Sequence, residues 1–308
     1  MKKITIILTT ALFAISCDND KPPCDNKPPG EVTPNRIYSV FDFRPAPGQF
    51  VNLLPEYEPC NTQEDMNRKA EEQIRGNNRG LISLGGFGGF VIFGFERPVV
   101  NVPGVDDFVI WGNAILGSSE PGIVMVMYDA NGNGLPDDEW FELAGSEFRS
   151  SETIHNYKIT YFRPDNDTAR IKWINNQGDT GYIQQVFSRR QPYFPQWITE
   201  DSLVFRGSKL ANNAEDLSGG AGINYFLHAF PWGYVDNHPN NDPRSNFNIE
   251  WAVDSNGNSV HLPAIHFVKV YTALNQQAGW LGEISTEVSG AEDLHPEVIY
   301  PRTRIVTP

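Results

Sequence analysis

The chain has 308 residues, with 40% hydrophobic and 12% aromatic content, which is the composition of a protein that folds around a core rather than of a disordered chain. Its 38 acidic and 24 basic side chains give a formal net charge of −14. This charge repels a phosphate backbone and provides no basic footprint to bind one, so we expect no nucleic-acid partner.

The N-terminus is typical of a lipoprotein signal peptide. Lys2 and Lys3 precede an apolar stretch, 4–15, which has the length of a signal-peptide core and is too short to cross a bilayer. The sequence AISC follows and is similar to a bacterial lipobox, in which the cysteine becomes acylated. We therefore predict a signal peptide at 1–16 and a lipid anchor on Cys17, with a plain secretion signal and a chance cysteine as the alternative.

A polar spacer follows the predicted anchor. Residues 17–35 are rich in Pro, Asp, Asn and Lys, and an acidic cluster stands directly behind Cys17. This cluster looks like the signal that sends Bacteroidetes lipoproteins to the outer cell surface. We therefore expect the protein in the outer membrane, held by its lipid anchor alone and facing the cell exterior.

Two cysteines remain, Cys24 and Cys60. An even pair in an oxidising compartment can form a disulfide, which would tie the spacer to the folded part. Two free thiols are the alternative, because Cys24 lies in the Pro-rich spacer.

One helix is well marked in the predicted single domain, 36–308. Thr62 with Asp65 three positions later forms a capping-box pattern, good helix formers follow, and Gly76 ends the run. The helix is mostly polar, so we expect it on the surface.

The rest of the domain is predicted to be β structure. Short runs rich in β-branched and aromatic residues are separated by Gly, Asn, Asp or Pro. This spacing indicates an all-β protein, namely an antiparallel β-sandwich of jelly-roll type with one peripheral helix. The predicted strands are 37–41, 50–54, 81–95, 107–115, 122–128, 140–144, 157–162, 171–174, 202–207, 247–254 and 266–272.

The connection YDANGNGLPDDEWFE, at 128–142, is rich in oxygen ligands. Side-chain oxygens at alternate positions, then a glycine and a backbone carbonyl, match the first half of an EF-hand loop. Trp140 stands where an EF-hand has its bidentate glutamate, so Glu139 or Asp138 would have to replace it. We predict a structural calcium ion, with a metal-free cluster of Asx turns as the alternative. The predicted ligands are Asp129, Asn131, Asn133, Leu135, Asp137 and Glu139.

Several longer stretches carry a resemblance to a known family. LGGFGGFVIFGF, SSEPGIVMVMYDANGNGLPDDEWFELAGSE and FPWGYVDN resemble the Bacteroidetes "cell surface protein" lipoproteins, and the likeness covers most of 78–295. The resemblance implies a place in an outer-membrane uptake system, in which a surface lipoprotein passes its ligand to a TonB-dependent transporter. Such systems include those for cobalamin, so a corrinoid is an implied ligand. The resemblance supplies no catalytic residues.

The segment 191–248 has few strand signals and many aromatic residues, and we expect it to be a long loop insertion that carries the ligand site. Exposed rings could stack on a sugar or a corrin edge, with polar side chains beside them. Packing of the rings in the core is the alternative. The predicted ligand-binding residues are Trp197, Tyr225, Trp232, Tyr234, Asp236 and Asn237.

Three functions therefore stay open. The chain could capture a nutrient, such as a corrinoid, without catalysis; it could be a carbohydrate-binding sandwich; or it could cleave glycans. The late acidic residues Glu283, Glu287, Glu292 and Asp293 could serve a glycosidase, complete a metal site or be solvated. The sequence has no GxSxG or HExxH motif, so we predict no catalytic residue.

Overall fold

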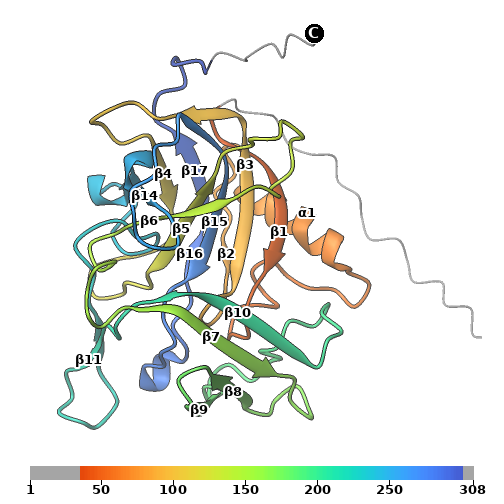
Figure 1. The fold of residues 1–308 in the computed structure, drawn as a ribbon. Coiled ribbons are helices and arrows are strands. Elements are labelled where there is room, and N and C mark those ends of the chain that lie inside the picture. The colour runs from red at the N-terminus through yellow and green to blue at the C-terminus, as the bar shows by residue number, and fades with distance from the viewer. Residues whose placement is uncertain (1–34, 301–308) are drawn as a thin grey trace, which may run out of the picture.

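The computed structural model describes residues 35–300, so the predicted signal peptide, Cys17 and Cys24 lie outside the described residues. The regular secondary structure of the described chain consists almost entirely of antiparallel β strands joined by turns and loops (Figure 1). Among these residues, no helix is both long and apolar enough to cross a membrane. The strands are β1 (Ile37–Arg44), β2 (Ile82–Ser83), β3 (Phe90–Val100), β4 (Phe108–Trp111), β5 (Gly122–Met127), β6 (Trp140–Leu143), β7 (Ile154–Phe162), β8 (Ile171–Asn175), β9 (Thr180–Ile183), β10 (Ser202–Lys209), β11 (Ala214–Asp216), β12 (Tyr225–Leu227), β13 (Asn246–Phe247), β14 (Ala252–Val253), β15 (Ala264–Thr272), β16 (Glu287–Val288) and β17 (Gly290–Asp293).

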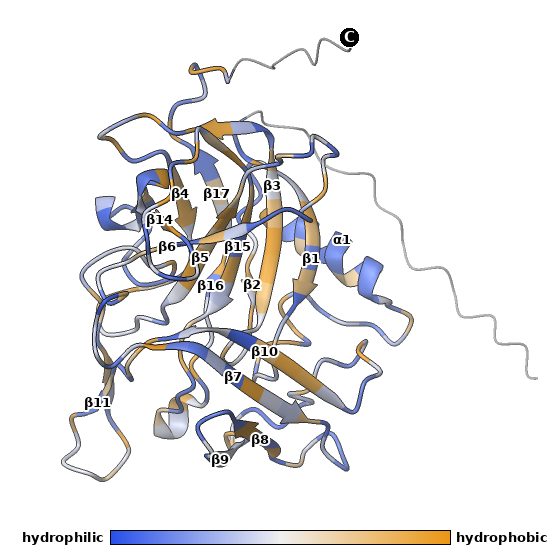
Figure 2. Ribbon diagram, viewed as in Figure 1, coloured by the Kyte–Doolittle hydropathy of each residue, from blue (hydrophilic) through white to orange (hydrophobic). Residues whose placement is uncertain are grey.

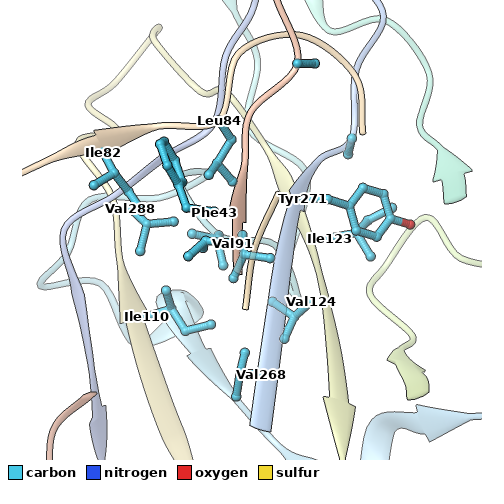
Figure 3. Packing of buried hydrophobic residues seen from close by; sticks show 14 of the residues in the cluster. Phe43, Ile82, Leu84, Val91, Ile110, Ile123, Val124, Val268, Tyr271 and Val288 are labelled. Atoms are coloured by element: carbon cyan, nitrogen blue, oxygen red, sulfur yellow. The ribbon is translucent and has the colours of Figure 1, made fainter. Parts of the chain in front are cut away.

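The largest sheet has six strands in the order β1-β3-β15-β5-β6-β14. Its central strand, β15, pairs antiparallel with β3 and β5, and Val268 lies opposite both Phe93 and Val126. These are β-branched and aromatic side chains of the kind that pack well on a pleated surface. Figure 3 shows Val91, Val124 and Val268 close together within the buried cluster.

A second sheet has four strands in the order β10-β7-β8-β9, and it lies across one end of the larger sheet (Figure 1). The two sheets are in close contact. The Tyr161 hydroxyl on β7 donates to Phe87 O at 3.2 Å. Gly88 has a φ of +84°, and a Cβ built on it would lie 2.3 Å from Phe205 Cβ on β10. Only glycine allows the chain to pass β10 at this distance.

Three smaller sheets complete the β structure, and all three are antiparallel. Their orders are β13-β4-β17, β16-β2 and β11-β12. The prediction of an all-β antiparallel sandwich with one peripheral helix is confirmed, but two predicted strands are wrong. The chain turns at 50–54, where Leu53 N donates to Phe50 O at 2.9 Å. Within the predicted strand 247–254, residues 249–251 form a 3-10 helix between two short strands.

Within 35–300, α1 (Gln63–Ile74) is the one α-helix, and three short 3-10 helices accompany it, namely η1 (Pro243–Ser245), η2 (Ile249–Trp251) and η3 (Gly279–Leu281). The predicted capping box is present, because Thr62 and Asp65 each accept a hydrogen bond from the other's backbone N–H. The helix buries Met66, Ala70 and Ile74, which are four residues apart and therefore share one face. Figure 2 shows that the helix is largely hydrophilic, as expected for a peripheral helix.

Cys60 lies shortly before α1 and takes part in a disulfide. It is the one cysteine within 35–300, so its partner lies outside the described residues. The pairing with Cys24 stays a prediction.

The segment 191–248 is not the loop insertion that its sequence suggests. It contains β10 to β13, and β10 forms an edge of the four-stranded sheet. Six of its ten aromatic residues are buried in the core, because burying a large ring stabilises the folded state. The segment is therefore part of the scaffold.

Candidate ligand site

The predicted calcium loop joins β5 to β6 and is organised around Asp129. The Asp129 carboxylate accepts hydrogen bonds from the N–H groups of Gly132 at 2.8 Å, Asn133 at 3.2 Å and Gly134 at 3.0 Å. The N–H of Asp129 itself donates to His266 Nδ1 at 3.1 Å. These contacts wrap the backbone round one carboxylate, as in an Asx turn.

The second carboxylate of the loop, Asp137, holds two side-chain amides. The NH2 groups of Asn131 and Asn133 donate to it at 3.0 and 2.9 Å, and these bonds, that of Asn133 first, lower the pKa of Asp137. Calcium fits this set of oxygens only if both amides turn so that their oxygens, rather than their NH2 groups, point with the Asp137 carboxylate toward one ion. The other two predicted ligands, Leu135 and Glu139, are exposed.

Four of the six predicted ligand-binding residues are buried, namely Trp197, Tyr234, Asp236 and Asn237. The Trp197 ring packs against Phe43 with ring centroids 6.0 Å apart, and its Nε1 donates to Gln63 Oε1 at 3.1 Å. Burial removes these side chains from any ligand at the surface, so the alternative of core packing holds for the two buried rings.

The other two predicted residues, Tyr225 and Trp232, keep exposed surface, but each packs against a different part of the chain. Tyr225 on β12 packs beside Gly279, whereas Trp232 packs against Trp251 with ring centroids 4.7 Å apart. The six residues therefore do not form one site.

A different group of acidic residues gathers inside the molecule. The carboxylate oxygens of Glu120, Asp236 and Glu287 all lie within 4.8 Å of one another. We call these three residues the carboxylate cluster. Asp236 accepts hydrogen bonds from the N–H of Asn113 at 2.7 Å and of Glu287 at 2.9 Å. Within 35–300 this is the one place where three or more potential acidic, histidine or cysteine ligands meet so closely.

The carboxylate cluster cannot carry three full negative charges without a compensating ion or proton. Burial raises the pKa of Glu120 to about 8 and of Asp236 to about 7, and the charge of Asp236 adds to the shift of Glu120. Burial and the Glu120 charge raise the pKa of Glu287 well above its usual range. The oxygens suit either shared protons or a hard cation.

The remaining late acidic residues have different surroundings. Glu292 pairs with Arg36 at 2.9 Å, so it is an ordinary ion pair near the surface. Asp293 on β17 is buried and accepts from the N–H of His295 at 2.9 Å. Neither residue belongs to the carboxylate cluster.

Glu283 faces a cavity of about 220 Å³, which we call the inner cavity. It lies between the four-stranded sheet, which contributes Tyr161, Trp173 and Ile183, and the chain that follows β15. Aromatic rings and side-chain amides make up most of its wall. The lining residues are Gly86, Phe87, Tyr161, Trp173, Ile183, Asn212, Leu274, Asn275, Gln276, Gln277 and Glu283.

One oxygen of Glu283 is unsatisfied. Its Oε1 accepts from the N–H of Gln49, whereas its buried Oε2 has no hydrogen-bond partner among the described residues. Burial raises the pKa of Glu283 to about 8. A buried carboxyl oxygen without a hydrogen-bond partner costs free energy, so this oxygen is available to a ligand group as a donor while the carboxyl is protonated and as an acceptor once it is ionised.

Fold and site together define an all-β sandwich with a small polar cavity beside its second sheet. The chain matches no known family profile and no curated protein. The resemblance to surface lipoproteins therefore stays a prediction, and the chemistry of the site is interpreted from its own residues.

Proposed function

We propose that the protein is a non-catalytic surface lipoprotein that captures a small ligand for a TonB-dependent outer-membrane uptake system. The ligand, or one unit of it, enters the inner cavity. The observation that carries this proposal is the buried Oε2 of Glu283, which has no hydrogen-bond partner among the described residues and belongs to a residue that lines the inner cavity. A ligand hydroxyl or ammonium group would satisfy it.

The size and lining of the inner cavity favour a small, polar ligand. Pockets for drug-sized ligands usually have volumes of about 300–1,000 Å³, and this one has about 220 Å³. A whole corrinoid does not fit in that space, although a side group of one could enter. Trp173 is the one of the three aromatic residues that keeps exposed surface, so one sugar unit could stack on its ring and hydrogen-bond to the four side-chain amides. This lining favours the carbohydrate-binding alternative.

Glycan cleavage receives less support from the same lining. A glycosidase of the common type needs two carboxyl groups on either side of the scissile bond. Among the described residues that line the inner cavity, only Glu283 has one. The carboxylate cluster nearby is engaged with backbone N–H groups and hydroxyls, which supports capture without catalysis.

Titration calorimetry tests the proposal. The folded domain is titrated with cyanocobalamin, with neutral oligosaccharides and with amino sugars at concentrations up to about 1 mM. The titrations are made at about pH 9, above the shifted carboxyl pKa, where we expect binding that Glu283→Gln weakens about tenfold because the amide lacks the charge of the ionised carboxylate. Glu64→Gln, on the exposed side of α1, is the matched control and should bind normally.

Two outcomes contradict the proposal. The absence of heat with all three classes argues against ligand capture. If wild type and Glu283→Gln bind a ligand with the same heat and affinity, the ligand lies outside the inner cavity.

A further inference from the structure

A second cavity of about 280 Å³, which we call the outer cavity, lies between the two sheets and is separate from the proposed ligand site. The six-stranded sheet contributes Met125 and Glu142, and the four-stranded sheet contributes His155, Arg206 and Ser208. Its lining residues are Met125, Glu139, Trp140, Glu142, Phe148, His155, Asn156, Arg206, Gly207, Ser208, Val253, Asp254, Ser255 and Tyr271.

Three of these residues form a continuous chain of contacts across the cavity. Ser208 Oγ on β10 lies 2.7 Å from Glu142 Oε2 on β6 and 3.1 Å from His155 Nδ1 on β7. The other ring nitrogen, His155 Nε2, lies 3.0 Å from Phe148 O. The chain therefore links the six-stranded sheet to both strands at the edge of the four-stranded sheet.

The backbone is irregular where the three residues meet. The pairing of β7 with β10 runs regularly to Tyr157 and Gly207 and then shifts, so Ser208 lies opposite an extra residue of β7. Asn156, next to His155, has a φ of +56°. Bulges of this kind redirect side chains, and a non-glycine residue with positive φ is uncommon. Ser208 is also fixed by its N–H, which donates to the Tyr271 hydroxyl at 2.9 Å.

The hydrogen bonds among Glu142, Ser208 and His155 require a particular number of protons. A carbonyl oxygen only accepts, so the contact with Phe148 O places a proton on His155 Nε2. Ser208 has one hydroxyl proton for its two remaining contacts. Both are hydrogen bonds only if one more proton lies on Glu142 Oε2 or on His155 Nδ1. It can pass between them through Ser208, because each arrangement converts into the other by a concerted shift along the chain.

Loss of that proton breaks the chain. Ser208 can then donate to Glu142 or to His155, but at the other contact two lone pairs face each other. Lone pairs at hydrogen-bond distance repel, so one of the three side chains has to move away. A second added proton does no such harm, because Ser208 Oγ can accept from both neighbours.

We infer that Glu142, Ser208 and His155 form a proton-dependent latch between the two sheets. The latch holds the two sheets together at the outer cavity while Glu142 and His155 together bind at least one exchangeable proton, and it opens when this proton is lost. A ligand that brings its own donor, such as an ammonium group, to Glu142 replaces the proton and opens the contact to His155 in the same way.

The surroundings of Glu142 place this change near neutral pH. Burial raises the pKa of Glu142 to about 7, against the hydrogen bond from Ser208, which lowers it. Arg206 faces the same cavity and favours loss of the proton, whereas nearby acidic groups favour its retention. The other titratable groups that face the latch are Glu139, Asp254, Tyr271 and, behind Glu142, Tyr234.

Amide hydrogen exchange tests the latch at about pH 6 and about pH 9, on either side of the shifted carboxyl pKa. Peptides covering 148–157 and 205–210 report on the latched strands, and a peptide covering 91–95 of β3 is the internal control. After correction for the intrinsic pH dependence of exchange, wild type should exchange about tenfold faster at the higher pH in the latched peptides only.

The variant Glu142→Gln keeps the hydrogen bonds of the latch but removes its titratable carboxyl proton. The glutamine amide donates to Ser208, Ser208 donates to His155 Nδ1, and no titratable proton is needed, so protection should be independent of pH. Ser208→Ala should be open at both pH values. Glu64→Gln, on the exposed side of α1 and outside the outer cavity, should behave as wild type.

The proposal is overturned if wild type shows no corrected change with pH. It is equally overturned if Glu142→Gln keeps the wild-type change. Because glutamine preserves the shape and all the hydrogen bonds, this variant decides the question even if Ser208→Ala fails to fold. Nitrogen NMR of the His155 ring gives a second measurement, since both nitrogens should sense the shared proton in wild type and only Nε2 should be protonated in Glu142→Gln.

Discussion

Glu283 is buried with one carboxyl oxygen bound to the backbone of Gln49 and the other without a donor among the described residues. Burial raises its pKa from an ordinary value of 4.5 to about 8. The folded state therefore binds a proton that the unfolded state releases across this range. By linkage, the stability that this residue contributes is present below the unfolded pKa and is lost as the pH rises through the folded pKa.

Replacing this residue gives the first prediction. Glu283→Gln should reduce the decline in the free energy of unfolding between about pH 5 and about pH 8 by on the order of 2 kcal/mol, because the amide cannot ionise. Urea denaturation at several pH values measures it, with Glu64→Gln as control. A wild-type slope in Glu283→Gln would show that this carboxyl titrates normally in the folded protein.

For single residues, the sequence indicates which side chains could belong to a site but not which side chains surround them. Glu283 and Glu287 stand out as late acidic residues, yet nothing in the chain shows that Glu120 and Asp236 join Glu287 from other strands and loops. Such contacts depend on topology. The same holds for Trp197, because a ring that stacks on a ligand and a ring that fills the core are identical in a sequence.

Among the elements, the 129–139 loop has the most developed polar network. Asp129 and Asp137 accept most of its hydrogen bonds, and the amides of Asn131 and Asn133 complete it. A shorter loop begins at Asp254, which accepts from the N–H groups of Asn256 and Asn258 at 2.8 and 2.9 Å. That loop has the Asx turns without a second carboxylate, so it is a natural control for metal binding.

The second prediction is that calcium stabilises the longer loop. If the ion replaces the amide protons at Asp137, calcium at about 100 times its Kd should add about 2.7 kcal/mol to the free energy of unfolding. Asp129→Ala and Asp137→Ala should each abolish the rise in melting temperature, whereas Asp254→Ala should keep it. A melting curve that neither calcium nor a chelator shifts would leave the metal-free Asx turns as the correct description.

Regular elements are predictable where the local pattern is strong. The capping box at Thr62 fixes the start of α1, and long alternating runs such as β3 and β15 have the expected type. The stretch 50–54 has strand-forming residues but turns, since the N–H groups of Leu53 and Leu54 both donate to Phe50 O. Short strands such as β2 and β16 exist only because they meet each other.

At the scale of the whole molecule, both cavities lie where the two sheets meet. The inner cavity is bounded by Phe87 and Tyr161, which hydrogen-bond across the junction, and the outer cavity by Glu142 and Ser208. The sequence predicts the all-β fold class and the spacing of the strands. It does not predict the contact between the two sheets, because this contact depends on how two sheets formed from interleaved segments dock on one another.

Gly88 allows the junction itself to be tested. A Cβ there would meet Phe205 Cβ at 2.3 Å, so Gly88→Ala must either push β10 away or distort the turn. Gly104 is the matched control, since its φ of +79° is similar to the +84° of Gly88 but nothing lies within 4 Å of its Cβ position. Gly104→Ala should cost only the positive-φ penalty, about 1 kcal/mol.

The third prediction is that Gly88→Ala costs about 2 to 4 kcal/mol, because overpacking adds about 1 to 3 kcal/mol to the same backbone penalty. Urea unfolding of the two variants measures the difference. Since Phe87 precedes Gly88 and lines the inner cavity, Gly88→Ala should also weaken any ligand bound there, and Gly104→Ala should not. Equal stability losses in the two variants would mean that Phe205 yields to the added methyl group, and that the close approach of the sheets contributes little to holding them together.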